Sequence, residues 1–103
     1  MSKKVAITGM GIISSIGNTV EENYNALVKG EKGISSIENF ETIHKGVIKV
    51  GEIKLTNQQL SEQLGISMDN NFSRTSLLGA IAAQQAVENA GIQDVNDYRS
   101  GLI

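Results

Sequence analysis

Few side chains in this sequence of 103 residues could carry chemistry. It contains no cysteine and a single histidine, His44. The lack of cysteine excludes disulfides, cysteine-ligated zinc, iron–sulfur clusters and a cysteine nucleophile within these residues. Metal sites and acid–base pairs that work near neutral pH usually draw on several histidines. The remaining candidates are a glycine-rich segment at residues 9–11, His44 itself, the acidic pair Glu21–Glu22 and the cation Arg74.

The glycine-rich segment could bind a phosphate group. Gly9 and Gly11 follow the apolar run Val5–Ile7, which predicts a short strand buried on both faces. A Gly-x-Gly turn after such a strand leaves backbone N–H groups open to phosphate. The dinucleotide pattern needs a third glycine where this chain has Ser14, and no ribose-binding acid follows the next strand candidate. We therefore predict a structural turn here, with a nucleotide-binding α/β domain as an alternative function.

The other candidates each have a structural interpretation. His44 has no second histidine and no clustered carboxylates near it in the sequence, which is typical of an exposed loop residue. The pair Glu21–Glu22 is interpreted as helix N-terminal charge that the macrodipole favours. Arg74 is the only cation between Lys54 and Arg99. A capping-region charge is favoured there over a ligand contact, and both interpretations stay open.

A helix is predicted where the first polar cluster follows the glycine segment. Thr19 and Glu22 form a capping-box pattern, and Gly30 is suited to end the helix near Lys29. The apolar residues of this helix fall on one stripe, which predicts a buried face: Val20, Tyr24, Leu27 and Val28.

The middle of the chain predicts shorter elements. Residues 33–40 show no helical or strand period and are predicted to form an ordered loop. Residues 47–55 are rich in β-branched side chains but contain Gly51, which favours an edge strand or a hairpin arm. The run Thr56–Gln59 is a second capping box and predicts a short helix that ends at Gly65.

The strongest helical pattern covers residues 73–90. It is rich in small side chains and has no charge between Arg74 and Glu88, so we expect neighbours on more than one of its sides. Residues 99–103 turn apolar, and we expect them to begin a strand.

Length and composition limit the class of protein. The chain has room for one small domain, with 40% hydrophobic and 19% charged residues, which fits neither a disordered tract nor a membrane span. Its net charge of -2 argues against a nucleic-acid surface. The apolar stretch after Lys3–Lys4 does not fit a secretory signal peptide, because polar residues interrupt it and no signal-peptidase cleavage site follows. We therefore expect a cytoplasmic protein with a small core and marginal stability of its own.

Three blocks of sequence stand in a recognisable order. Residues 5–18 read VAITGMGIISSIGN, residues 24–34 read YNALVKGEKGI, and residues 74–92 read RTSLLGAIAAQQAVENAGI. In this order the blocks resemble the β-ketoacyl synthases, the condensing enzymes that depend on acyl carrier protein. Their corresponding strings are V-x-I-T-G-x-G-x-x-S-P-x-G, W-x-x-L-x-x-G-x-S-G-I and R-x-S-x-x-A-x-x-A-A. The resemblance covers the whole chain and departs from the family at Ser15, Tyr24 and Lys32, where Pro, Trp and Ser are usual.

The resemblance implies a fold and a reaction. The family has the α/β thiolase-like fold, in which two mixed sheets sandwich buried helices in α-β-α-β-α layers, and this chain would form an N-terminal fragment of it. The implied reaction is a decarboxylative Claisen condensation that uses one cysteine and two histidines. In the family these groups follow well after the segment at residues 99–103. No catalytic residue, cofactor or metal ligand is therefore assigned to any position of this chain.

The resemblance also implies partners. These are acyl carrier protein with its acyl and malonyl thioesters, and a second synthase subunit in a homodimer or heterodimer; neither nucleic acid nor membrane is expected. Elongation synthases commonly carry Lys or Arg near the position of Asn70–Asn71 to meet the acidic carrier protein. Arg74 is the one residue that we assign as a candidate carrier-protein contact.

Our leading hypothesis is that residues 1–103 are the N-terminal part of a β-ketoacyl synthase N-terminal domain, truncated in a strand and inactive alone. A non-catalytic chain-length-factor-like partner and the nucleotide-binding domain are the alternatives. Acyl chain length, the choice between fatty-acid, polyketide and aryl-polyene pathways, and the carrier's identity stay open. Because a cut sheet leaves an apolar edge, we expect dye binding or self-association.

Overall fold

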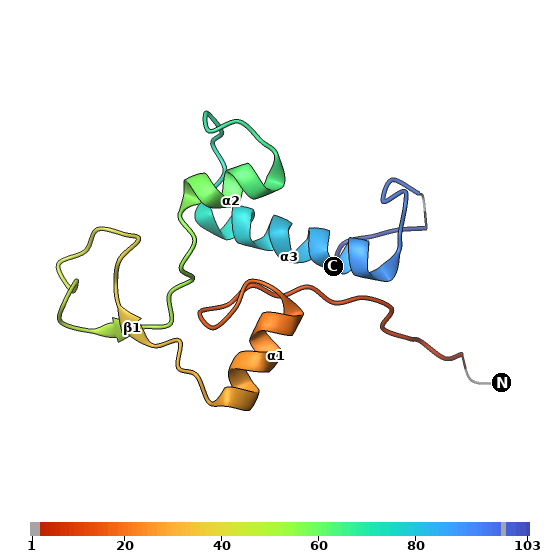
Figure 1. Ribbon diagram of the computed structural model, residues 1–103. Coiled ribbons are helices and arrows are strands. Elements are labelled where there is room, and N and C mark those ends of the chain that lie inside the picture. Colours follow the sequence, from red (N-terminus) through yellow and green to blue (C-terminus); the bar gives the residue numbers. More distant parts are fainter. Residues whose placement is uncertain (1–2, 98) are drawn as a thin grey trace.

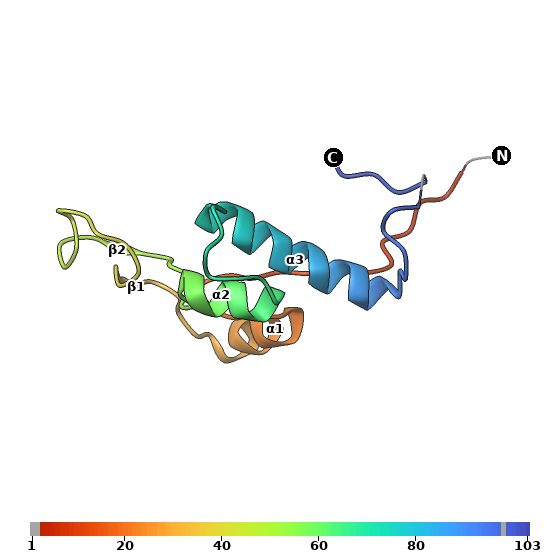
Figure 2. The same ribbon diagram turned by 90° about the horizontal axis from the view of Figure 1, so that it is seen from above.

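In the residues that the structure describes, the chain forms three helices and one short hairpin. The computed structural model describes residues 3–97 and 99–103. In chain order the elements are α1 (Val20–Lys29), β1 (Ser35–Ser36), β2 (Lys49–Val50), α2 (Asn57–Leu64) and α3 (Arg74–Ala90). Figures 1 and 2 show α2 lying on α3, the hairpin projecting to one side, and the N-terminal segment running along α3.

Each helix begins and ends as the sequence predicts. The side-chain oxygens of Thr19, Thr56 and Ser73 accept a hydrogen bond from the backbone N–H three residues later, and each helix ends at a left-handed glycine. The capping box at Thr56 is complete. At α1 the Glu22 carboxylate accepts from Asn18 N at 2.6 Å instead of from Thr19 N, so its reciprocal bond is displaced by one residue.

The apolar core lies between α2 and α3. Leu60, Leu77 and Ile81 are buried there, and five half-buried side chains pack against them: Ile13, Leu55, Leu64, Ile66 and Leu78. A core built on three fully enclosed side chains is small, which agrees with the marginal stability expected from the sequence.

The hairpin is shorter than its sequence pattern suggests. Ser35 pairs with Val50 and Ser36 with Lys49 in antiparallel register. The prediction of a hairpin arm within residues 47–55 is confirmed for two residues. The loop predicted over residues 33–40 contains β1, because Ser35–Ser36 finds this partner across the chain.

The N-terminal strand prediction is wrong for this chain. Residues 5–7 are described and are extended but unpaired, and Val5 and Ile7 are 97% and 85% exposed. A strand needs a neighbour to satisfy its N–H and C=O groups, and the described residues place none beside it. Residues 99–103 are likewise exposed and lie in no described strand, so the strand expected there does not form in this structure.

The apolar stripe of α1 is also exposed, contrary to expectation. Tyr24, Leu27 and Val28 are 67–70% exposed, whereas Asn23 and Ala26 are the buried residues of the helix. The helix therefore packs against residues 14–17 through the side that carries Asn23, and no described element covers its apolar stripe.

The molecule is more open than a finished domain of this length. Its radius of gyration is 16.6 Å, against about 13 Å for a compact domain of 100 residues. Its accessible surface is 8237 Å², against roughly 5,600 Å² for a folded monomer of this mass. None of the helices in the described part of the chain has the length and apolar character needed to cross a membrane.

This open surface predicts strong binding of a hydrophobic dye. We expect the chain alone to enhance 1-anilinonaphthalene-8-sulfonate fluorescence and to self-associate in analytical ultracentrifugation, because exposed apolar area of this extent favours contact. A monodisperse monomer without dye enhancement would contradict the account of an incomplete core.

Candidate functional site

The glycine-rich segment lies along α3. Residues 9–13 are extended, and two of their backbone N–H groups donate to side chains of the helix. Met10 N donates to Asn89 Oδ1 at 3.1 Å, and Ile12 N donates to Gln85 Oε1 at 3.0 Å. The two carboxamides stand four residues apart on α3, and the two amides stand two residues apart on the segment.

The glycines allow this close approach. A Cβ added at Gly9 would lie 2.6 Å from Ala90 N, and one added at Gly11 would lie 2.8 Å from Ala86 N. Two extended residues span about 6.6 Å, and four helical residues span about 6 Å. The Gly-x-Gly spacing therefore matches the alanine spacing on α3, and backbone packs directly on backbone.

This geometry corrects the sequence interpretation of the glycines. Neither Gly9 nor Gly11 has a positive φ, and the expected turn lies at residues 14–17 instead. The N–H groups of Met10 and Ile12 are committed to α3 and are unavailable to a phosphate. The structure thus gives the glycines a packing role and removes the observation that favoured nucleotide binding.

Gln85 connects both ends of the loop that follows. Its Oε1 accepts from Ile12 N, and its Nε2 donates to Asn18 O at 2.6 Å. We expect Gln85→Ala to lower the free energy of unfolding by about 2 kcal/mol, because two backbone groups lose their partner. Gln84→Ala, on the exposed side of the same turn, is the matched control and should change stability by less than about 0.5 kcal/mol. Urea unfolding followed by circular dichroism tests both; equal effects would rule out the connecting role.

A polar cluster holds the turn at residues 14–17 against α1. Ser14 Oγ donates to Asn23 Oδ1, and Asn23 Nδ2 donates to Gly17 O at 3.1 Å and Thr19 O at 2.7 Å. Asn23 is buried, and these bonds satisfy its amide. The sequence analysis missed Asn23, since its position beside an apolar stripe gave no sign of burial.

Replacing Ser15 with proline should stabilise the chain. Ser15 is the first central residue of the turn that Ser14 and Gly17 close, its φ is not positive, and Ser14 is already extended. Reduced freedom in the unfolded chain should add about 0.4–1 kcal/mol. Thermal unfolding measures the change; a lower melting temperature would mean that the ring collides with Gly33, which packs against Ser15.

A second polar cluster fastens the hairpin to the start of α3. The Glu52 carboxylate, 8% exposed, accepts from Glu38 N at 2.9 Å and from Asn39 N at 3.0 Å. Arg74 donates to Asn57 Oδ1 at 3.0 Å and to Ile53 O at 2.8 Å. The guanidinium thus connects the first turn of α3 to the chain between β2 and α2.

The electrostatics of this cluster favour a charged Glu52. Burial raises the pKa of its carboxyl, but the two backbone N–H bonds, together with the charges of Arg74 and Lys54, outweigh burial and hold the pKa below its ordinary value of 4.5. Glu52 is therefore a structural anion, which the sequence analysis did not identify.

The structure separates the candidate residues of the sequence analysis. His44 is exposed in the hairpin loop, as expected, and Glu21–Glu22 lie in the first turn of α1. Arg74 is half-buried with internal partners, which supports the capping-region interpretation; a carrier-protein contact stays a proposal. Within residues 3–97 and 99–103, no three His, Cys, Asp or Glu side chains gather as a metal site would require.

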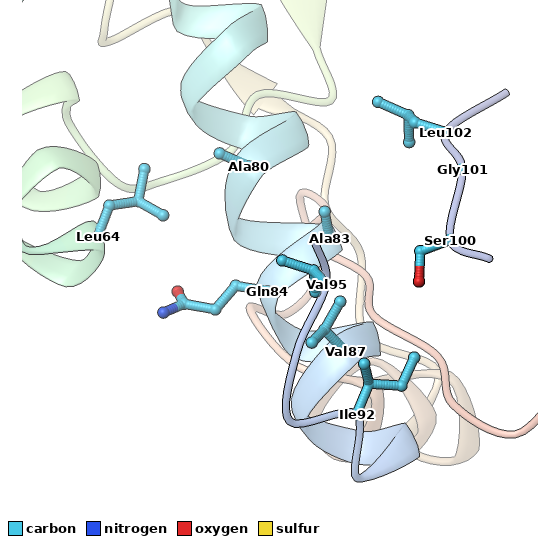
Figure 3. A pocket seen from close by; sticks show the side chains of 10 residues that line it. All are labelled: Leu64, Ala80, Ala83, Gln84, Val87, Ile92, Val95, Ser100, Gly101 and Leu102. Carbon is cyan, nitrogen blue, oxygen red and sulfur yellow. The ribbon is translucent and has the colours of Figure 1, made fainter. Parts of the chain in front are cut away.

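An apolar groove of about 900 Å³ lies on the side of α3 that α2 and the glycine segment leave open (Figure 3). Its walls are Leu64 from α2, one face of α3, and the residues after it. Its apolar side chains are Leu64, Ala80, Ala83, Val87, Ile92, Val95 and Leu102. Two sides of α3 are thus covered, one by α2 and one by the glycine segment, in agreement with the neighbours expected from its sequence, and a third side is apolar and open.

Comparison with known proteins decides the family. The family model "Beta-ketoacyl synthase, N-terminal domain" matches residues 2–103. The chain belongs to the β-ketoacyl synthase family. Its relatives include 3-oxoacyl-[acyl-carrier-protein] synthase 2 of Vibrio cholerae, with 36% identity over all of this chain and 24% of the relative. Synthase 2 of Staphylococcus aureus N315 is 33% identical over 99% of this chain, and synthase 1 of Buchnera aphidicola is 36% identical over 88%.

This β-ketoacyl synthase chain spans about a quarter of the length of the curated relatives it matches. Within that quarter there is no cysteine nucleophile and no pair of histidines, because the sequence has no cysteine and one histidine. The residues that its geometry singles out hold segments together: Gln85 and Asn89, Asn23, and Glu52 with Arg74.

Proposed function

We propose that the polypeptide that carries this chain is a 3-oxoacyl-acyl-carrier-protein synthase. The observation that supports it is the family match along essentially the whole chain, with relatives so named at 32–36% identity. In the proposed reaction a cysteine thiolate takes an acyl group from a carrier thioester. The malonyl C2–carboxylate bond then breaks with loss of CO₂, C2 bonds to the acyl carbonyl carbon, and the cysteine leaves as thiolate.

This chain contributes scaffold to that enzyme. We assign α3 to a buried helical layer of the thiolase-like α-β-α-β-α fold, because two of its sides are packed and the third is an apolar groove. The segments at residues 5–7 and 99–103, which lie in no described strand, are assigned to strands of its sheets, since both carry exposed apolar side chains here. On this proposal residues 1–103 belong to the N-terminal domain of the synthase.

The partners and setting belong to the same proposal. The carrier protein brings the acyl and malonyl groups, and fatty-acid synthesis is the pathway that the relatives support over polyketide or aryl-polyene synthesis. A dimeric enzyme working in the cytoplasm is proposed on the family resemblance alone.

Arg74 has two roles in this proposal, as an internal link that holds the hairpin and as a contact for the carrier protein. Two of its five N–H donors are used internally, on Asn57 and Ile53, and the side chain is half-buried. The remaining donors could meet a carrier carboxylate, while the internal bonds hold the hairpin in place. Arg74→Lys keeps the charge but loses the forked geometry, so it separates these two roles.

Mass spectrometry of the acylated protein tests the function. The complete polypeptide, incubated with an acyl-carrier-protein thioester, should gain the mass of one acyl group per subunit, and residues 1–103 alone should gain none. Absence of the adduct on the folded complete polypeptide would reject the enzyme and favour the chain-length-factor-like partner.

A further inference from the structure

We draw no further inference here: the strongest candidate, the apolar groove on the open side of α3 between Leu64 of α2 and the residues after the helix, carries nothing because no described residue shows what covers it, in a chain that spans about a quarter of the length of its relatives.

Discussion

Replacing Gly11 with alanine is expected to lower the free energy of unfolding by about 3–5 kcal/mol. The new methyl group would lie 2.7 Å from Gln85 Cβ and 2.8 Å from Ala86 N, and it would meet Ala82 O as well. Two of these neighbours are helix backbone, which cannot rotate away. The segment must therefore move off α3 and give up its bonds to Gln85 and Asn89.

A second glycine on the same helix provides the matched control. Gly79 lies within α3, and a Cβ added there meets nothing within 4 Å. Gly79→Ala should therefore stabilise the chain by about 0.5–1 kcal/mol, because alanine loses less backbone freedom in a helix. Urea unfolding followed by helical circular dichroism measures both variants. Similar effects of the two substitutions would contradict the close packing of residues 9–13 on α3.

Removing the Glu52 carboxylate should have the next largest effect. Glu52→Ala leaves Glu38 N and Asn39 N without an acceptor in a partly buried position, and we expect a loss of about 2–4 kcal/mol at pH 7. Glu52→Gln keeps one acceptor oxygen and should lose less. The hairpin is then released from α3 first, which hydrogen exchange of residues 37–53 can detect.

The same carboxyl gives stability a defined pH dependence. Its pKa is lower in the folded chain than its ordinary value of 4.5. Folding is therefore favoured by the carboxylate above about pH 4.5, and this contribution is lost as the pH falls through the folded pKa. Glu52→Gln should remove this part of the acid sensitivity, while Glu31→Gln, an exposed control, should retain it. Identical acid profiles for the two variants would exclude the Glu52 cluster as the cause.

Local sequence signals predicted the helices well. Thr56 with Gln59, Ser73, and the glycines that end each helix act within one turn, so their effect does not depend on distant parts of the chain. The small residues of α3 also predicted neighbours on several sides. The resemblance to β-ketoacyl synthases, carried by three blocks, was confirmed by the family match to residues 2–103.

Predictions that depended on distant partners were wrong or incomplete. Val5–Ile7 has the composition of a buried strand, yet no described strand lies beside it. No described element covers the apolar stripe of α1, and the buried residues of this helix are the hydrogen-bonded Asn23 and Ala26. The roles of Gln85 and Asn89 could have been predicted by comparing the rise per residue of a helix with that of an extended segment. Their four-residue helical spacing equals the two-residue extended spacing of the glycine segment.

The central claim is that this chain is part of a condensing enzyme and holds none of its reactive groups. The most direct measurement is malonyl-carrier-protein-dependent release of CO₂ together with formation of 3-oxoacyl-carrier protein. We predict turnover by the complete polypeptide and none by residues 1–103 alone. Turnover by residues 1–103, or no product from the folded complete polypeptide, would contradict the account.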